Sequence, residues 1–216
     1  MSLNLGYYFE HPDKCAVPEL LAGVTYTYEL LARLKTLLDE EYPGGYVDPT
    51  AKIGAHAVIA GCVYVGANAE IGAHAYVRPY SVIGKNCVVG HGSEVKRTLM
   101  FDGAKIASLA FVGDSLLGAG ARIGSGVITA NRRFDQGDIS LKLDGEKHSL
   151  GSDFFGLVLG DSSRLGANCT PQPGTHVGRY TRVFPQTAIR GFVPSYKRVW
   201  EKRELEFSEN EAVELK

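Results

Sequence analysis

A six-residue period dominates the sequence between Val47 and Val95. Every sixth position there carries a β-branched aliphatic residue, and glycine usually follows it. The aliphatic positions are Val47, Ile53, Ile59, Val65, Ile71, Val77, Ile83, Val89 and Val95. Neither an α-helix nor an alternating strand has this period. A hexapeptide repeat predicts a solenoid, because each short strand must stack on its neighbours to bury its apolar side.

The period continues after Val95 and is interrupted once. It runs through Met100, Ile106, Val112, Leu117 and Ile123, and returns at Leu159, Leu165, Val177, Val183 and Ile189. Between the two runs, residues 139–143 alternate in polarity before Asp144-Gly145, a signal for a two-residue hairpin turn. We therefore expect a parallel β-helix over residues 46–193, with a projecting hairpin insertion at 132–157.

The two ends of the chain lack the period. Leucines at helical spacing follow Pro18 and stop at Pro43-Gly44-Gly45, which predicts an N-terminal helical segment over residues 1–45. We expect this segment to cap an end of the solenoid and protect its edge from strand addition. Residues 194–216 are rich in charge around Trp200, which predicts a short C-terminal helix followed by an acidic tail.

Composition excludes several classes of protein. The 23 basic and 24 acidic residues give a net charge of −1, so the chain lacks the basic footprint of a nucleic-acid binder. No segment approaches the about 20 apolar residues of a membrane span, and no secretory signal is visible. The four cysteines have no paired spacing, which favours reduced thiols in a cytoplasmic protein.

Five short motifs resemble one enzyme family. They are Val77-Arg-Pro79, Glu94-Val-Lys96, Phe111-Val-Gly-Asp114, the run from Gly124 to Asn131, and Arg133-Phe-Asp135. Together with the repeat they resemble the hexapeptide-repeat acyltransferases, and most of all the C-terminal acetyltransferase domain of bifunctional glucosamine-1-phosphate acetyltransferase/sugar-1-phosphate nucleotidyltransferases. The resemblance implies an all-β, left-handed parallel β-helix with three hexapeptides in each coil, a homotrimer, and acetyl-CoA as co-substrate. Because the segment before the repeat is too short for the nucleotidyltransferase half, it also implies a separate nucleotidyltransferase as a possible partner.

Two cations break the repeat at one corner. Arg78 and Lys96 stand where glycine usually follows the aliphatic residue, and three hexapeptides separate them. They should then lie one coil apart, about 4.8 Å, and like charges at that distance favour an anion between them. The alternative is two solvated side chains that diverge into water. In the resembling family these positions hold the phosphate of the sugar phosphate, and Asn131 contacts the sugar. For Asn131 the alternative is a corner residue that tolerates left-handed backbone geometry.

The residues expected for catalysis have changed. The resembling family has a histidine base where this chain has Ser108, and a tyrosine where it has Phe111. The step from Val95 to Met100 is one residue short, which shortens the coil and places His91 directly beneath Ser108. His91 is therefore a candidate base, acting through the Ser108 hydroxyl or alone. The alternative is that His91 is an ordinary corner residue.

The histidines and the family resemblance lead to two ligand expectations. Trimeric β-helices also include zinc-dependent γ-class carbonic anhydrases, but in this chain no two histidines fall within one coil together with a supporting Arg/Gln/Asp set, so we expect no metal site. For acetyl-CoA, the resemblance implies a groove between neighbouring solenoids and binding positions at Ser125, Ala167, Pro185, Lys197 and Arg198. Pro185 lacks the N–H donor that such a backbone-lined groove would use.

Two hypotheses from different classes remain. The first is an acyl-CoA-dependent acetyltransferase-like protein with a degenerate site, acting on an amino-sugar phosphate or nucleotide sugar. The second is a catalytically silent trimer that binds a sugar phosphate or nucleotide sugar, or that serves as an assembly module for a nucleotidyltransferase. Binding of CoA distinguishes the two.

Overall fold

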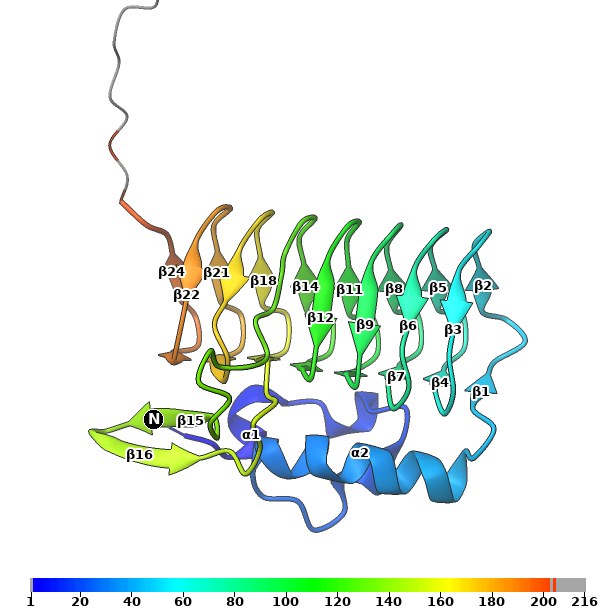
Figure 1. The fold of residues 1–216 in the computed structure, drawn as a ribbon, viewed down its shortest axis with the longest axis horizontal. Coiled ribbons are helices and arrows are strands. Elements are labelled where there is room, and N and C mark those ends of the chain that lie inside the picture. The colour runs from blue at the N-terminus through cyan, green and yellow to red at the C-terminus, as the bar shows by residue number, and fades with distance from the viewer. Residues whose placement is uncertain (1, 203, 205–216) are drawn as a thin grey trace, which may run out of the picture.

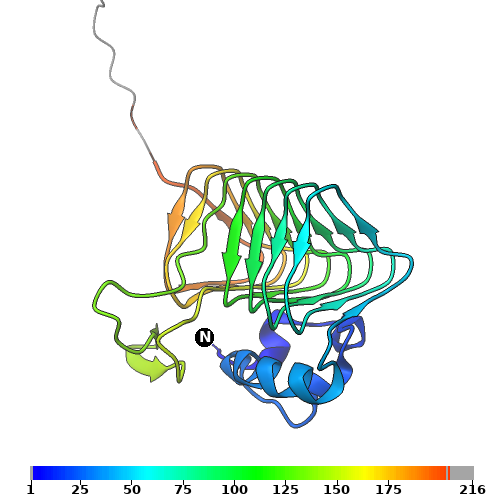
Figure 2. The same cartoon turned by 45° about the vertical axis from the view of Figure 1, so that its right-hand side comes forward.

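The computed structural model describes residues 2–202 and 204. Its body is a left-handed parallel β-helix, in which the chain winds around a triangular prism from β1 to β24 (Figures 1 and 2). On two faces the strands of successive coils pair in parallel throughout, and the third face is divided into the sheets β3–β6–β9–β12 and β19–β22. The six-residue period thus corresponds to one side of the triangle, as predicted.

Three columns of strands form the three faces. The first face consists of β1 (Tyr46–Val47), β4 (Tyr64–Val65), β7 (Val82–Ile83), β10 (Leu99–Met100), β13 (Leu116–Leu117), β17 (Leu157–Leu159), β20 (Thr175–Val177) and β23 (Phe192–Val193). The second face consists of β2 (Lys52–Ile53), β5 (Glu70–Ile71), β8 (Val88–Val89), β11 (Lys105–Ile106), β14 (Arg122–Ile123), β18 (Arg164–Leu165), β21 (Arg182–Val183) and β24 (Arg198–Val199). The third face consists of β3 (Val58–Ile59), β6 (Tyr76–Val77), β9 (Glu94–Lys96), β12 (Phe111–Gly113), β19 (Thr170–Pro171) and β22 (Ala188–Ile189).

The aliphatic positions of the repeat form the core of the prism. From Val65 onward these side chains are almost completely buried, and small residues such as Ala69 and Cys87 fill the space between them. The first coil is different, because nothing stacks beneath it: Val47 is 43% and Ile53 44% exposed.

The strand register confirms the shortened step. Val65 pairs with Ile83 in the next coil, and Ile83 pairs in turn with Met100. The second of these coils is therefore one residue shorter than the first. The stacking of aliphatic residues is kept across the shorter coil, because a corner absorbs the missing residue.

The insertion leaves the solenoid after Asn131 and contains the predicted hairpin. Strands β15 (Ser140–Leu143) and β16 (Glu146–Ser149) pair in antiparallel fashion. Asp144 and Gly145 form the turn, both with the positive φ that such a turn requires. The hairpin projects from the solenoid, but it also packs on the protein: Leu141 and Leu143 are buried in the same apolar cluster as the N-terminal segment.

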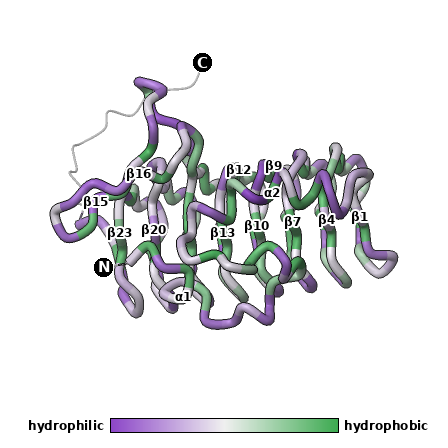
Figure 3. The backbone as a smooth tube through the Cα atoms, turned by 90° about the horizontal axis from the view of Figure 1, so that it is seen from below, coloured by the Kyte–Doolittle hydropathy of each residue, from purple (hydrophilic) through white to green (hydrophobic). Residues whose placement is uncertain are grey.

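The N-terminal segment lies along the first face rather than over an end of the solenoid (Figures 1 and 3). It contains α1 (Leu5–Tyr8), the 3-10 helices η1 (Pro12–Lys14) and η2 (Pro18–Leu21), and α2 (Thr27–Glu41). The buried leucines of α2 share a cluster with the outward side chains of the first face: Leu30, Leu31, Leu34, Leu38, Val82, Leu99, Leu116 and Val158. Covering this long apolar face buries more surface than covering one end would, which explains the difference from the expected cap.

The chain after Pro194 also differs from expectation. Where a short helix was predicted around Trp200, residues 198–199 form β24 and pair with β21. Val199 continues the column of aliphatic residues, so stacking on the previous coil prevails over the helical pattern. The rest of the predicted acidic tail, residues 205–216, lies outside the described part of the chain.

The four cysteines are free thiols. Burial raises the pKa of the Cys15 and Cys87 thiols to about 11 and about 12. These two thiols are packing residues rather than reactive nucleophiles. Separately, no helix within the described residues has the length and hydrophobicity needed to cross a membrane.

Candidate active site

A buried carboxylate, Asp114, lies at the corner between the third and first faces. It follows β12 with a left-handed backbone conformation (φ 50°) and is 0% exposed. Its Oδ1 accepts a hydrogen bond from Nε of Arg97 at 2.5 Å. Its Oδ2 accepts from Nζ of Lys96 at 3.1 Å and from Nδ2 of Asn131 at 2.5 Å. Because a buried charge is costly unless it is paired, Asp114 fixes the positions of all three donors.

Arg78 and Lys96 occupy the same corner in adjacent coils. The pairing of Val77 with Val95 places them so, as their separation by three hexapeptides predicts. However, each cation already has a carboxylate: Nη1 of Arg78 lies 2.9 Å from Oε1 of Glu94, and Lys96 binds Asp114. Repulsion between the two cations therefore does not by itself require an external anion.

A cavity of about 290 Å³ opens beside these cations. It is lined by Arg78, Pro79, Tyr80, Lys96, Arg97 and Phe154. Three cationic side chains around one cavity give it a positive potential, because the two carboxylates beside them, Glu94 and Asp114, neutralise only part of their charge. The cavity can receive a small anionic group.

Phe111 and Asn131 adjoin this corner through Gly113. A methyl group at Gly113 would lie 2.7 Å from Nδ2 of Asn131 and 2.8 Å from Cζ of Phe111. Only glycine allows both side chains to pack against this backbone position. The structure thus brings Phe111, Asn131 and Lys96 together, three of the four residues predicted to bind substrate, and Arg78 lies one coil away.

The predicted catalytic residues and three of the five predicted cofactor residues share another corner, between the second and third faces. His91, Ser108, Ser125, Ala167 and Pro185 occupy equivalent positions in five successive coils. Backbone hydrogen bonds join the coils there, each running from the next residue to the carbonyl below: Leu109 N to His91 O (2.8 Å), Gly126 N to Ser108 O (3.2 Å), Asn168 N to Ser125 O (2.9 Å) and Gln186 N to Ala167 O (2.9 Å). His91 is therefore directly beneath Ser108, as predicted from the shortened coil.

Three histidines stack along the same corner. The rings of His56 and His74 lie 5.0 Å apart and nearly parallel, and His91 meets His74 edge-on at 5.6 Å. The rings pack on one another instead of converging on a common point. Accordingly, no group of three metal-binding side chains occurs within the described residues.

Lys197 and Arg198 lie elsewhere. Arg198 belongs to β24 and pairs with Arg182 on the second face, away from the corner that carries Ser125. The side chains of both residues are exposed. The structure therefore does not bring these two residues into the corner column.

Sequence reasoning missed three members of the site. Arg97 follows Lys96 with positive φ, and its partner Asp114 was known only as part of a motif. Phe154 returns from the insertion and lies between two cations, with Nζ of Lys96 at 4.3 Å and Cζ of Arg132 at 4.7 Å from its ring centre. The sequence signal for Arg97 is weak, a second cation directly after Lys96, whereas Phe154 gives none, because its placement depends on how the insertion folds back.

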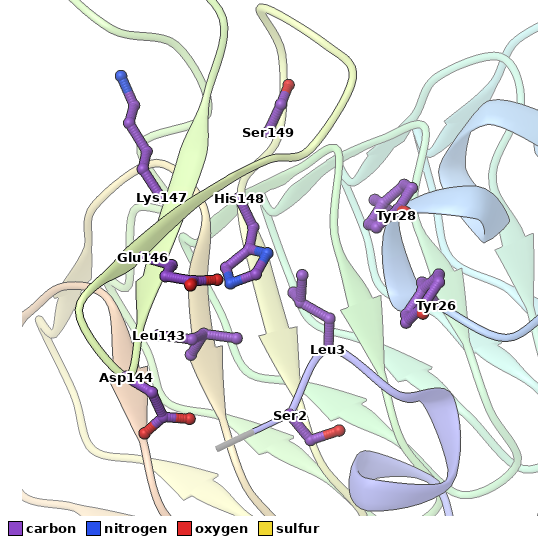
Figure 4. A pocket seen from close by; sticks show the side chains of 10 residues that line it. All are labelled: Ser2, Leu3, Tyr26, Tyr28, Leu143, Asp144, Glu146, Lys147, His148 and Ser149. Carbon is purple, nitrogen blue, oxygen red and sulfur yellow. The ribbon is translucent and has the colours of Figure 1, made fainter.

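A second cavity, of about 680 Å³, lies between the hairpin and the N-terminal segment (Figure 4). The side chains of Glu146 and His148 lie next to each other on one side, and the stacked rings of Tyr26 and Tyr28 lie on the other. This cavity contains none of the residues predicted to act on substrate or cofactor.

Sequence comparison finds similarity between the coils and part of several named proteins. A family model described as the GMPPB C-terminal domain matches residues 59–142. A bifunctional sugar-1-phosphate nucleotidylyltransferase/acetyltransferase of Sulfurisphaera tokodaii is 34% identical over 100 residues, covering 46% of this chain and 25% of the relative. The bifunctional protein GlmU of Methanococcus vannielii is 32% identical over 116 residues, covering 54% of this chain and 28% of the relative.

Similar solved structures are more distant. A point mutant of AntD, an N-acyltransferase from Bacillus cereus in complex with dTDP-4-amino-4,6-dideoxyglucose and coenzyme A, has a TM-score of 0.43 at 15% identity. That alignment covers 73% of this chain and 76% of AntD. Likeness at this level bears on neither substrate nor mechanism. In sequence, the chain is similar to proteins named as bifunctional sugar-1-phosphate nucleotidylyltransferase/acetyltransferases, and it spans about a quarter of their length.

Proposed function

We propose that this protein is an acyl-CoA-dependent acyltransferase whose acceptor is an amino-sugar phosphate or a nucleotide sugar. One arrangement supports the proposal: the cationic cavity at Arg78 and the corner column of His91 and Ser108 flank the same strip of the third face. The N-terminal segment packs on the first face and leaves this strip uncovered (Figure 2). An acceptor lying across the strip meets cations at one end and the candidate base at the other.

At the cationic end, Arg78, Lys96 and Arg97 hold the phosphate of the acceptor. A phosphate accepts hydrogen bonds from guanidinium and ammonium groups with favourable charge. Asn131 donates its amide to Asp114, which leaves its carbonyl oxygen Oδ1 to accept from a sugar hydroxyl. Asp114 acts as a positioning residue, because it holds these groups without reaching the surface.

At the other end, His91 removes a proton from the acceptor ammonium, directly or through the Ser108 hydroxyl. The free amine then attacks the thioester carbonyl, and the thiol leaves. A histidine suits this step, because its imidazole ring can accept a proton and later release it.

The separation of the two ends favours the longer acceptor. His91 and Lys96 are five residues apart along one side of a coil, so their Cα atoms lie at most about 17 Å apart. Such a strip accommodates more than one sugar ring. A nucleotide sugar, with its diphosphate between two ring systems, suits it better than a sugar monophosphate.

The acyl-CoA would lie along the corner above Ser108. Ser125 and Ala167 have small side chains, and within the described chain their backbone N–H groups donate no hydrogen bond. These groups fit the amide oxygens of a pantetheine arm, whereas Pro185 offers no donor. Lys197 and Arg198 stand beyond this corner and would meet the phosphates only across a neighbouring solenoid, which is consistent with a homotrimer as the functional unit.

A silent binding or assembly trimer is the second candidate. Ser108 and Phe111 stand where a base and a tyrosine hydroxyl would be needed, and the relatives are named as bifunctional proteins of which this chain spans about a quarter. In that case a separate nucleotidyltransferase would be the partner.

Calorimetry and a thiol-release assay separate the two candidates. The enzyme hypothesis expects acetyl-CoA to bind and thiol to appear when a nucleotide amino sugar or glucosamine 1-phosphate is added. If the acceptor binds and CoA does not, the result would contradict the enzyme hypothesis and support the silent trimer. Substitutions Arg78→Ala and Lys96→Ala should each weaken acceptor binding at low salt, and unchanged affinity in both would exclude the cationic cavity. Light scattering, which gives the mass of the assembly in solution, tests whether three copies of the chain associate.

A further inference from the structure

Phe134 has the most exposed of the large hydrophobic side chains among the described residues. It lies in the loop that begins the insertion and belongs to the motif Arg133-Phe-Asp135, which the proposed transfer reaction does not use. A phenylalanine ring in water contributes nothing to the core. Covering such a ring removes a large apolar area from water, which is favourable for binding.

Hydrogen bonds on both sides of Phe134 hold the loop in this conformation. The guanidinium of Arg133 donates two hydrogen bonds to the Asp135 carboxylate, one of them from Nε to Oδ1 at 2.7 Å. The same Oδ1 accepts from the backbone N–H of Gly137 at 3.2 Å. The backbone N–H of Gln136 donates to the carbonyl of Arg133, also at 3.2 Å. The loop therefore presents the ring with little conformational freedom left to lose on binding.

A third cavity, of about 400 Å³, lies beside the ring of Phe134. Pro173 adds a second apolar wall, and Arg132 and Gln172 add polar groups. The side chain of Gln172 is exposed, and its amide carries both donors and an acceptor. A flat aromatic surface beside an amide suits a planar ligand with hydrogen-bonding edges, such as a nucleobase.

Phe154 connects this cavity to the cationic cavity lined by Arg78, Lys96 and Arg97. Its ring lies between Nζ of Lys96 and the guanidinium of Arg132. The backbones of Arg132 and Phe154 form an antiparallel bridge, and Phe134 follows two residues after Arg132. The Cα atoms of Phe154 and Phe134 therefore lie within about 13 Å of each other. The two cavities are neighbours along the same edge of the protein.

We propose that the cavity beside Phe134 binds the base of a nucleoside diphosphate whose phosphates occupy the cationic cavity. The base stacks on the Phe134 ring, and the amide of Gln172 bonds to its edge. The inference rests on the proposed function, and it narrows the acceptor to a nucleotide sugar. A sugar monophosphate has no base to place against Phe134.

Coenzyme A also carries a base, but the acceptor is the better source. The cations next to Phe134, through Phe154, are those of the corner between the third and first faces. The proposed path of acyl-CoA follows Ser125 and Ala167 at the corner between the second and third faces. A base bound beside Phe134 is therefore joined to phosphates at the acceptor end of the site.

Calorimetry with UDP, CDP, GDP, ADP and inorganic pyrophosphate tests the proposal. At least one of the four nucleotides should bind about ten-fold more tightly than pyrophosphate, because stacking of the base adds to the affinity. Phe134→Ala should lower the affinity for that nucleotide to the value for pyrophosphate and leave pyrophosphate binding unchanged. Phe134→Tyr keeps a ring and should retain the preference. The matched control Tyr196→Ala removes another exposed ring, between β23 and β24, and should change neither affinity.

Two negative results have different meanings. Equal affinity for pyrophosphate and all four nucleotides would overturn the base site but leave the cationic cavity of the proposed function intact. If none of the five ligands binds, both proposals are contradicted. A Phe134→Ala variant that loses affinity only for coenzyme A, or only lowers the mass of the assembly in light scattering, would also overturn the base site. The ring would then contact the adenine of coenzyme A or a second copy of the chain.

Tryptophan fluorescence provides a second measurement. The chain has a single tryptophan, so Phe134→Trp/Trp200→Phe moves the fluorescent ring to the loop. Saturation with the preferred nucleotide should quench this fluorescence at least about two-fold, because the base stacks on the ring. Pyrophosphate should leave it unchanged. Equal fluorescence with saturating nucleotide and with pyrophosphate would show that the base does not lie on this ring.

Discussion

The side-chain amide of Asn131 donates to the carboxylate of Asp114 at 2.5 Å, joining the start of the insertion to the coil beneath it. The same carboxylate also accepts hydrogen bonds from the side chains of Lys96 and Arg97. One buried charge thereby joins cations of the coil before it to a polar group of the coil after it.

Removing this charge should destabilise the protein strongly. Asp114→Asn leaves Lys96 and Arg97, only 25% and 29% exposed, without their carboxylate. We expect the free energy of unfolding to fall by about 3 kcal/mol, as when one partner of a buried pair is lost. Urea unfolding measures it. The control Glu94→Gln removes the partner of the more exposed Arg78 and should cost less than about 1 kcal/mol. Equal losses would contradict the central role of Asp114.

Substitution of the candidate base should abolish turnover but not binding. His91→Gln is expected to lower kcat at least about 100-fold, the usual contribution of a general base. Ser108→Ala should lower it less if His91 acts alone, and equally if the proton passes through the hydroxyl. His74→Gln is the matched control, because this ring lies next to His91 at the same corner and meets it edge-on. Similar activity in His91→Gln and in the control would remove His91 from the mechanism.

Loss of Asp161 should release the N-terminal segment. Its Oδ2 accepts from the backbone N–H of Glu10 at 2.7 Å and of His11 at 3.2 Å, and its Oδ1 accepts from that of Ala119 at 2.7 Å. Asp161→Ala should cost about 2 to 3 kcal/mol, because hydrogen bonds to a charged group are lost. Hydrogen exchange should then accelerate in residues 5–14 more than in the coils. Protection that stays the same throughout would show that the apolar contacts suffice.

Acid should weaken the protein through His176. Burial lowers the pKa of this side chain to about 4, and it bonds to Thr27 Oγ1 and Gly174 O, each at 2.9 Å. Because the unfolded chain takes up a proton near its ordinary pKa of about 6.5, stability falls as the pH drops from about 6.5 towards about 4. The loss between pH 7 and pH 4.5 is on the order of 2 to 3 kcal/mol.

The variant His176→Gln separates this contribution from the other titrating groups. Its free energy of unfolding should depend less on pH across that window, whereas exposed His56→Gln should behave like the unsubstituted protein. An unchanged pH dependence in His176→Gln would show that the buried imidazole is protonated in the fold.

Periodicity alone predicted the coils, the shortened step and the vertical order of His91 and Ser108. These features follow from stacking at fixed intervals, which a linear sequence records. The N-terminal segment was misplaced because an amphipathic helix reveals its apolar side but not the surface that it covers. Phe154 was missed because its contact with Lys96 depends on the return path of the insertion. The predicted C-terminal helix was wrong because Val199 satisfies the stacking period.

The placement of the N-terminal segment has a consequence for how the chain folds. Tyr7 packs on Phe192 with ring centres 5.6 Å apart, Glu10 binds Asp161, and Thr27 binds His176. This segment therefore leaves the ribosome well before the coils that it contacts. Contacts of such wide sequence separation slow folding. We infer that coil growth can begin near Val47, but that the N-terminal leucines keep their apolar side uncovered until the later coils emerge.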